Sequence, residues 1–223
     1  MNAHATSDLP ASPDEAPPGS ARQGVRPRKE EILDVATTLF AERGYEGTSM
    51  NDVAERVGMR KASLFYHFAT KDALYEAVLD RIVTQVGSSL SAVYAGQGTL
   101  VDRLEAAADA TSRAFSERPF VARLLLREAM DWGPIIRGKL LETVMMVLEA
   151  GAQFIALGQR EGVFVAGEPK QLVLTALGAH ILPFAVVQLV EKYAGMDPFS
   201  QPFVEARRAA VRAQVRDMIV RKG

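Results

Sequence analysis

Basic side chains gather in two clusters in the first third of this 223-residue chain, although its formal net charge is −1. The clusters comprise Arg22, Arg26, Arg28 and Lys29, and then Arg60, Lys61, His67 and Lys71. A polyanion responds to the local distribution of charge rather than to the total. Lysine and arginine can satisfy the O6 and N7 atoms of guanine and can neutralise phosphates. These residue types therefore indicate nucleic-acid binding, and a mildly acidic remainder cancels their charge in the total.

The second cluster belongs to a segment with helical periodicity. Apolar side chains recur at three- and four-residue intervals over residues 32–40, as on one face of an amphipathic helix. Gly44 is expected to end this helix, and Thr48 or Ser49 can cap the next one. That second helix keeps apolar residues at helical spacing up to Val57. The segment therefore begins with two helices joined by a short turn.

A third short helix completes the pattern of a helix-turn-helix. Gly58 ends the second helix after about two turns, and the third is expected over residues 60–68. Four apolar side chains are expected to form the contact between these two helices: Val53, Val57, Leu64 and Phe68. This packing leaves the N-terminal end of the third helix pointing outward.

Base contacts are expected at that outward end. Recognition helices enter the major groove with their N-terminal end leading, which would bring Arg60, Lys61 and Ser63 to base edges. Three further residues would lie nearer the sugar-phosphate backbone, where they position the protein rather than read bases: Tyr66, His67 and Lys71. A Tyr-His-Phe triplet or an Arg-Lys pair alone is ordinary for a helix surface. The prediction of DNA contacts rests on finding these residue types together at one end of the third helix of a helix-turn-helix pattern.

Residues 32–74, ILDVATTLFAERGYEGTSMNDVAERVGMRKASLFYHFATKDAL, resemble the DNA-binding domain of the TetR/AcrR family of regulators. The resemblance implies an all-α fold with an N-terminal three-helix helix-turn-helix domain and a C-terminal helical bundle. It implies base contacts by Arg60, Lys61, Ala62 and Ser63. It implies phosphate contacts by Thr48, Tyr66, His67 and Lys71. Members usually have Tyr where this chain has Phe65, and Gly is common in place of Ala62, so one phenolic phosphate contact is lost and the approach to the groove changes.

Breaks in the pattern divide the chain into three parts. Residues 1–27 hold five of the eleven prolines and few large apolar side chains, which predicts a disordered arm whose basic end either lies along DNA or is a solvated linker. Residues 28–75 form the predicted DNA-binding domain, and residues 76–223 a helical ligand-binding and dimerisation domain. Beyond the third helix, further helices are expected over residues 71–94, 100–115, 120–130, 135–160, 169–193 and 203–220.

A homodimer is expected because a two-fold operator needs a two-fold protein. The family resemblance implies that the last two long helices, 169–193 and 203–220, form the contact. The second of them carries four small residues: Ala206, Ala209, Ala210 and Ala213. These alanines either permit close approach of a second copy or fill gaps within one chain.

A ligand site is expected among bulky apolar residues of the C-terminal part. The candidates are Met130, Trp132, Met145, Met146, Phe154, His180, Phe184 and Gln188. His180, Phe184 and Gln188 are spaced to share one helix face, and Pro183 is expected to kink that helix at its middle. Such adaptable side chains suit the wall of a cavity for a largely apolar or aromatic molecule with one or two polar atoms. The alternative is that they are ordinary core residues.

An enzyme is not expected. The chain has no cysteine, its three histidines stand at no metal-ligand spacing, and it has neither a glycine-rich phosphate loop nor a G-x-S-x-G motif, so no cofactor or metal is predicted. No apolar run approaches the roughly 18 residues of a membrane span, which predicts a cytoplasmic protein without a membrane partner.

The expected function is regulation of transcription, by default repression. The protein would bind a palindromic double-stranded DNA operator as a homodimer and would be released by a small effector. The alternative is a helical small-molecule-binding or interaction protein that no longer regulates through DNA. The outward basic residues of the third helix argue against that alternative.

Overall fold

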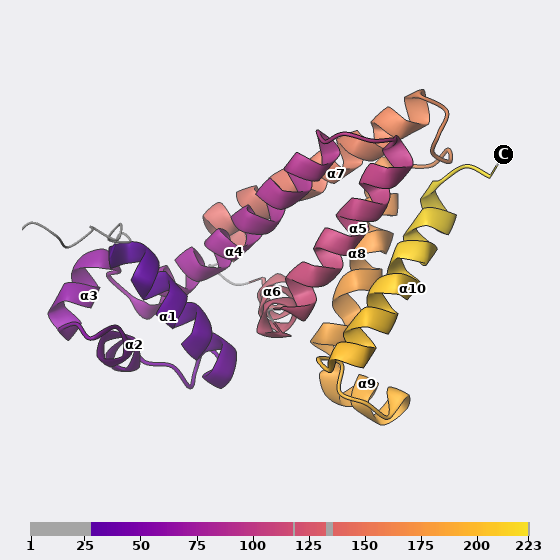
Figure 1. Cartoon of the computed structure of the whole chain (residues 1–223). Coiled ribbons are helices and arrows are strands. Elements are labelled where there is room, and N and C mark those ends of the chain that lie inside the picture. The colour runs from indigo at the N-terminus through magenta and orange to yellow at the C-terminus, as the bar shows by residue number, and fades with distance from the viewer. Residues whose placement is uncertain (1–27, 118, 133–135, 223) are drawn as a thin grey trace, which may run out of the picture.

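The computed structural model describes residues 28–117, 119–132 and 136–222, and helices account for most of them (Figure 1). The predicted arm, residues 1–27, lies outside the described residues. In chain order the helices are α1 (Arg28–Arg43), α2 (Met50–Val57), α3 (Lys61–His67), α4 (Lys71–Tyr94), α5 (Leu100–Ser116), α6 (Pro119–Asp131), the π-helical turn η1 (Ile136–Leu140), α7 (Leu141–Arg160), α8 (Pro169–Ala185), α9 (Val187–Ala194) and α10 (Gln201–Ile219). The predicted all-α fold is confirmed.

The first three helices form an N-terminal unit at one end of the molecule (Figure 1). Ser49 is the residue that caps α2: its hydroxyl accepts from the backbone N–H of Asp52, whose carboxylate accepts from the backbone N–H of Ser49. Gly58 ends α2 in the left-handed conformation, with φ of 72°. These local signals limit α2 to eight residues, and α3 follows after a tight turn.

Helix α4 connects this unit to the rest of the chain. It begins at the N-cap Thr70, and its 24 residues run through the predicted domain boundary after residue 75. Leu74, Val78 and Leu79 of α4 are fully buried in a core that continues from α1 into the C-terminal helices. Because one straight helix contributes to both parts of the core, a displacement of α4 within the bundle also moves the N-terminal unit.

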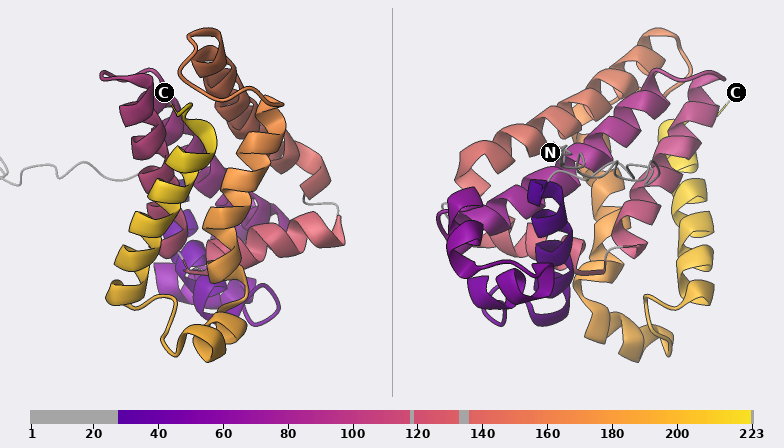
Figure 2. Two further views of the ribbon diagram at one scale, coloured as in Figure 1. Left: turned by 90° about the vertical axis from the view of Figure 1, so that its right-hand side faces the viewer. Right: turned by 60° about the vertical axis from the view of Figure 1, so that its left-hand side comes forward.

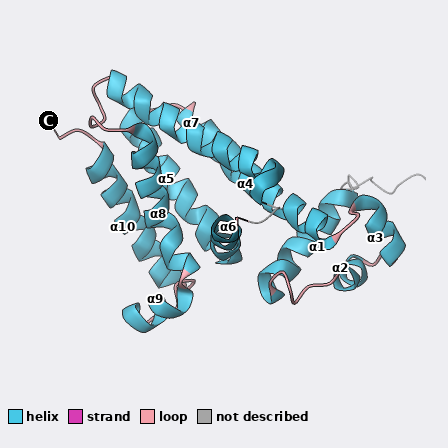
Figure 3. Cartoon of the chain, turned by 180° about the vertical axis from the view of Figure 1, so that it is seen from behind, coloured by secondary structure: helices cyan, strands magenta, loops and turns pink. Residues whose placement is uncertain are grey.

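The C-terminal helices form a bundle around α5 and α8. Helix α7 runs along α4, α10 packs against α5, and α6 packs against α8 (Figure 2). The chain end is tied to the loop after α7 by an isolated β-bridge between Phe164 and Val220. Viewed from behind, the described residues are helices joined by short loops (Figure 3).

Two of the predicted long helices are broken. The helix expected over residues 135–160 changes direction at Gly138, whose ψ of −145° is not helical. The helix expected over residues 169–193 bends by 83° between α8 and α9. Pro183 lies inside α8, and the bend comes three residues after it, at Val186. The kink predicted at Pro183 is therefore displaced toward the C-terminus.

The break near Pro183 has a local cause. Proline lacks the backbone N–H that would bond the carbonyl four residues earlier. That carbonyl, of Ala179, accepts instead from Nη2 of Arg207 in α10, at 2.5 Å. An arginine side chain from the last helix thus replaces the hydrogen bond that the proline removes.

The expectation that no segment is long and apolar enough to cross a membrane is wrong by length and composition. Residues Ile136–Arg160 reach a mean hydropathy of 1.6 over their most apolar window, enough for a membrane-crossing helix. In the fold this segment packs against α4 and α8 as a helix of the bundle. Only 28% of that window is buried within the described chain, and Met145 and Met146 are among its exposed residues.

Candidate nucleic-acid interface and internal cavity

The packed side of the helix-turn-helix has the predicted composition. Its four expected residues are buried: Val53, Val57, Leu64 and Phe68. Leu64 is the fully buried residue of α3, so it anchors that short helix on the unit. The prediction that these residues hold the third helix in place is confirmed.

The N-terminal end of α3 is exposed. Arg60 is its N-cap, and Lys61, Ala62 and Ser63 form its first turn with accessible side chains. Nζ of Lys61 lies 5.8 Å from the ring centroid of Phe65, four residues later on the same helix. Among the described residues, neither Arg60 nor Lys61 forms an ion pair with an acidic side chain. This end of α3 therefore presents uncompensated positive charge.

A second group of polar side chains lies beside this turn. Tyr66 is 88% exposed, and its ring meets that of His67 edge-on at 5.6 Å. Nζ of Lys71 lies 4.0 Å above the ring of Tyr45, whose hydroxyl donates to the carboxylate of Asp72. Burial and this carboxylate raise the pKa of Tyr45. The ring of Tyr45 thus fixes Lys71 at the start of α4.

The prediction that Thr48 holds a phosphate through its side chain needs correction. Thr48 is only 1% exposed, and its hydroxyl faces the backbone carbonyls of Leu39, at 3.1 Å, and Gly44, at 2.9 Å. The Gly44 carbonyl lies just after α1, where it has no helical partner, and the Leu39 carbonyl lies in the C-terminal part of α1. The threonine hydroxyl satisfies the turn between α1 and α2 and is turned away from solvent.

Lys29 also belongs to this region. Its Nζ lies 5.6 Å from the ring centroid of Phe68, just after α3. It stands beside the recognition helix although it is 32 residues earlier in the chain. The sequence analysis placed Lys29 only in the first basic cluster, because nothing in the spacing shows that α1 begins next to the end of α3.

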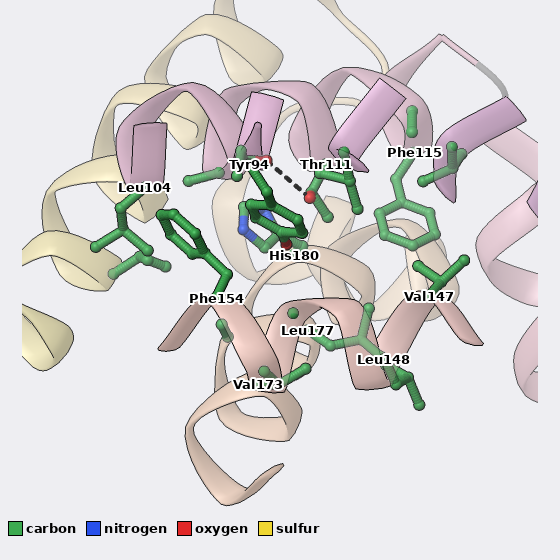
Figure 4. A pocket seen from close by; sticks show the side chains of 18 of the residues that line it. Tyr94, Leu104, Thr111, Phe115, Val147, Leu148, Phe154, Val173, Leu177 and His180 are labelled. Atoms are coloured by element: carbon green, nitrogen blue, oxygen red, sulfur yellow. Dashed lines mark hydrogen bonds between the residues drawn. The ribbon is translucent and has the colours of Figure 1, made fainter. Parts of the chain in front are cut away.

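The C-terminal bundle contains a cavity of about 170 Å³ that is partly open to solvent. Residues of α4, α5, α7 and α8 supply most of its wall, with two more from α10. Figure 4 shows aliphatic and aromatic side chains around the space, among them Leu104, Phe115 and Leu177. Polar groups come from Tyr94, Thr111 and His180, and the described lining residues include no charged side chain.

Aromatic packing shapes one end of this cavity. The rings of Tyr94 and Phe154 are stacked with centroids 4.6 Å apart, and Phe164 meets Phe154 edge-on at 5.7 Å. Burial raises the pKa of Tyr94, so the phenol stays protonated. The result is a flat apolar wall with one hydroxyl at its margin.

His180 is the buried polar residue of the cavity. It is 4% exposed, and its Nδ1 lies 2.9 Å from Oγ of Ser112, itself 3% exposed. Burial, with a smaller contribution from the positive charge of Arg207, lowers the pKa of His180 to about 4. The imidazole is therefore neutral at pH 7.

Only part of the predicted ligand-binding set lies together. Phe154 and His180 line the cavity, whereas Phe184 is buried against Phe199, with ring centroids 5.6 Å apart. The remaining candidates have exposed side chains on the surface: Met130, Trp132, Met145, Met146 and Gln188. Gln188 leaves the predicted stripe because the chain bends before α9. Met145 and Met146 instead line a second pocket, of about 530 Å³, beside Lys170 and Leu174.

Several cavity residues were not anticipated from the sequence. Tyr94 and Thr111 supply polar atoms, Leu104 and Phe115 supply apolar wall, and Ser112 lies behind the wall as the hydrogen-bond partner of His180. An apolar residue at helical spacing has the same signature whether it faces a core or a cavity. Only the pairing of a buried serine with a buried histidine distinguishes the site, and that pairing is 68 residues apart in the chain.

Within the described residues, no group of three or more His, Cys, Asp or Glu side chains is arranged to hold a metal ion. The two regions are a basic exposed surface at one end of the molecule and an apolar cavity in the bundle.

Comparison with known proteins agrees with this geometry. The family model described as "Bacterial regulatory proteins, tetR family" matches residues 32–78. The biofilm operon negative transcriptional regulator IcaR of Staphylococcus aureus is 52% identical over 48 residues, which are 22% of this chain and 26% of IcaR. The alignment thus spans about a quarter of that relative.

The fold extends the similarity to most of the chain. A TetR/AcrR-family regulator from Thermobifida fusca aligns with a TM-score of 0.68 and 23% identity over 84% of this chain and 96% of its own. The structure of AibR in complex with isovaleryl coenzyme A and operator DNA aligns with a TM-score of 0.67 and 19% identity over 84% of this chain and 97% of AibR. Residues 32–78 thus match the N-terminal domain of the tetR family, and the fold over most of the chain is similar to that of TetR/AcrR-family structures.

Proposed function

We propose that this protein is a cytoplasmic transcriptional repressor that binds a two-fold symmetric DNA operator as a homodimer and is released when a small effector enters the bundle. The observation that carries the proposal is the exposed, uncompensated basic end of α3, formed by Arg60 and Lys61, on a helix that Leu64 anchors. IcaR, similar over this region, is a negative regulator, and AibR was crystallised with operator DNA.

The residues of the exposed surface have distinct proposed roles. Arg60, Lys61, Ala62 and Ser63 would meet base edges, because a recognition helix leads with its N-terminal end. Tyr66, His67 and Lys71 would hold phosphates. Lys71 is well suited to this role because the ring of Tyr45 already fixes its position. A fixed cation loses less side-chain entropy on binding.

Dimerisation is supported by an exposed apolar face on α8 and α10. Leu174 and Leu182 of α8 are 50% and 57% exposed. The four alanines of α10 are also exposed in the single chain: Ala206, Ala209, Ala210 and Ala213. They therefore do not fill gaps within this chain, which favours close approach of a second copy. Two copies would present their α3 helices to half-sites about one DNA turn, roughly 34 Å, apart.

Coupling between cavity and DNA would run through α4. Ile82, Val83 and Tyr94 of this helix line the cavity, and its first turn carries Lys71. A ligand that needs more space than the empty cavity offers would shift α4 and change the separation of the two recognition helices. It can release DNA only to the extent that it binds the released arrangement more tightly.

The proposal is tested by selecting fragments from a random DNA pool and measuring their binding. The intact protein is expected to select a two-fold symmetric sequence and to show a steep fall in affinity with salt. Lys61→Ala should relax the preference at one base position of each half-site, at a cost of about 1–3 kcal/mol. Lys71→Ala should weaken binding to all sequences and reduce the salt slope by about 1.

The control is Lys222→Ala, which removes an exposed lysine near the chain end and should leave both measurements unchanged. An unchanged consensus for Lys61→Ala would refute the assignment of α3 as the reading helix. Absence of salt-dependent DNA binding by the intact protein would overturn the regulatory function and favour a binding protein without a DNA target.

A further inference from the structure

We propose that the bundle cavity is specific for an uncharged, ring-sized apolar ligand that carries one hydrogen-bond acceptor, and that Nε2–H of His180 donates to that acceptor. This inference rests on the proposed function, because such a ligand would be the effector. It deepens that proposal by naming the chemistry of the ligand and the side chain that recognises it.

The size of the cavity sets the scale of the ligand. An apolar cavity of about 150 Å³ in a protein core stays dry and binds benzene. The cavity here is slightly larger, at about 170 Å³, and its wall is mostly aliphatic and aromatic. It therefore fits one six-membered ring with a short substituent. Helices α4 and α5 both contribute to this wall.

The wall also restricts the charge of the ligand. Its described residues include no carboxylate, ammonium or guanidinium group. His180 is neutral at pH 7, because burial lowers its pKa to about 4. An ion that enters an apolar site without a counter-ion loses its hydration and gains nothing in return. Carboxylates and ammonium ions of the right size should therefore be rejected.

The hydrogen bond to Ser112 determines which ring nitrogen of His180 carries the proton, and so whether His180 donates a hydrogen bond to a ligand or accepts one. Both side chains are buried, so the hydroxyl hydrogen of Ser112 needs an acceptor inside the protein. Its partner among the described residues is Nδ1 of His180, at 2.9 Å. When the hydroxyl donates to Nδ1, the ring proton lies on Nε2. His180 then acts as a donor toward the cavity, and the ligand must supply an acceptor such as a carbonyl oxygen.

The other two polar side chains are less suited to this role. The hydroxyl of Thr111 donates to the backbone carbonyl of Ala107 at 2.9 Å, the bond dashed in Figure 4, so its hydrogen is already used. Tyr94 has a hydroxyl that can donate, and it stands at the stacked aromatic end of the cavity beside Phe154. Tyr94 is therefore the alternative donor to His180, and a single substitution can distinguish the two.

Four probes of similar size test the inference by isothermal titration calorimetry on the full chain without DNA: acetophenone, ethylbenzene, benzoate and benzylammonium. Acetophenone is expected to bind about tenfold more tightly than ethylbenzene, the value of one neutral hydrogen bond. Benzoate and benzylammonium should give no measurable heat of binding. Equal affinity for acetophenone and ethylbenzene, measurable binding of either ion, or no binding of any probe would each overturn the inference.

Variants identify the donor. The double substitution Ser112→Ala with His180→Phe removes both polar groups together and leaves no unpaired partner. It should keep affinity for ethylbenzene and lose the advantage of acetophenone. Thr111→Val is the matched control within the cavity and should keep the full advantage. If Tyr94→Phe removes the advantage and the double variant keeps it, the assignment of His180 is wrong.

The same samples separate this inference from the proposed function. If acetophenone binds with the expected selectivity but leaves operator affinity unchanged, the cavity assignment stands and the effector role fails. If the protein binds its operator but none of the probes, DNA regulation stands and the ligand class proposed here fails. Ethylbenzene binding by the double variant also shows that the variant is folded.

Discussion

Arg81 of α4 and Asp34 of α1 are joined by an ion pair in which Nη1 of the arginine lies 2.8 Å from Oδ1 of the aspartate. The same guanidinium donates to Glu30 at 3.3 Å and to Thr37 at 2.9 Å. The next residue along α4, Ile82, lines the bundle cavity. Two successive residues of one helix thus contact the DNA-binding unit and the cavity.

Arg81→Ala should therefore weaken the connection between ligand and DNA. Arg81 is 17% exposed and its acidic partners are about half exposed, so we expect a loss of only about 1–3 kcal/mol in the free energy of unfolding. Operator affinity should fall equally for all sequences, and a bound ligand should change that affinity less than in the intact protein. Urea unfolding and DNA titrations with and without ligand measure the two effects.

Arg81→Lys is the control, because it keeps the charge but offers fewer fixed donors. It should give an intermediate result in both measurements. If Arg81→Ala left the effect of the ligand on DNA affinity at its full size, the contact between α4 and α1 would have no part in the coupling.

Thr48→Val should lower stability without changing DNA specificity. The hydroxyl of Thr48 is buried against the carbonyls of Leu39 and Gly44, and valine has the same shape but no donor. The two carbonyls would lose a partner, at a cost of about 1–2 kcal/mol in the free energy of unfolding. Thr48→Ser, which keeps the hydroxyl, should be closer to the intact protein. A loss of salt dependence in DNA binding by folded Thr48→Val would instead indicate a phosphate contact.

The helices could be predicted wherever a local signal marks their ends. Gly58 and Ser49 delimit α2, and α4 has the bounds expected from the sequence. The residues that pack α3, such as Leu64, were also predictable, because helical spacing separates buried from exposed positions within the N-terminal unit. The role of Thr48 in the turn between α1 and α2 was not predictable, because a polar residue before a helix is equally suited to a buried turn and to a phosphate contact.

The cavity was harder to predict than the helix-turn-helix. Met146 and Trp132 are bulky and apolar, yet both lie on the surface, at 71% and 55% exposed. Residue type reports the preference for burial, but only the packing of helices far apart in the chain decides which apolar faces meet. The arginine that occupies the carbonyl freed by Pro183 was not predictable either, because Arg207 reaches α8 from α10.

Protonation of His180 should destabilise the fold at acidic pH. Its pKa is about 4 in the folded protein and 6.5 in the unfolded chain, so below pH 6.5 the unfolded state binds the proton more readily. Stability should therefore be level above about pH 6.5 and fall as the pH decreases toward 4, by about 3 kcal/mol in all for this group. Urea unfolding of the intact protein and of His180→Asn between pH 4.5 and 7.5 measures the difference.

Because carboxylates also titrate toward the acidic end, the difference between the two proteins is the informative quantity. The intact protein should lose more stability than His180→Asn between pH 6.5 and 4.5. Parallel pH profiles would mean that the imidazole titrates as it does in the unfolded chain, and hence that it is not held neutral in the fold.

Arg207 and Pro183 should show strong energetic coupling. Arg207→Leu removes the donor to the Ala179 carbonyl, which then has no partner because Pro183 has no N–H, and we expect a loss of about 1–3 kcal/mol. Pro183→Ala supplies a backbone N–H four residues after that carbonyl. In the double variant this N–H can replace the arginine, so the loss caused by Arg207→Leu should be smaller than in the intact background. A double-mutant cycle in urea measures the coupling. Additive losses would show that Arg207 stabilises α8 by packing rather than by its hydrogen bond to the Ala179 carbonyl.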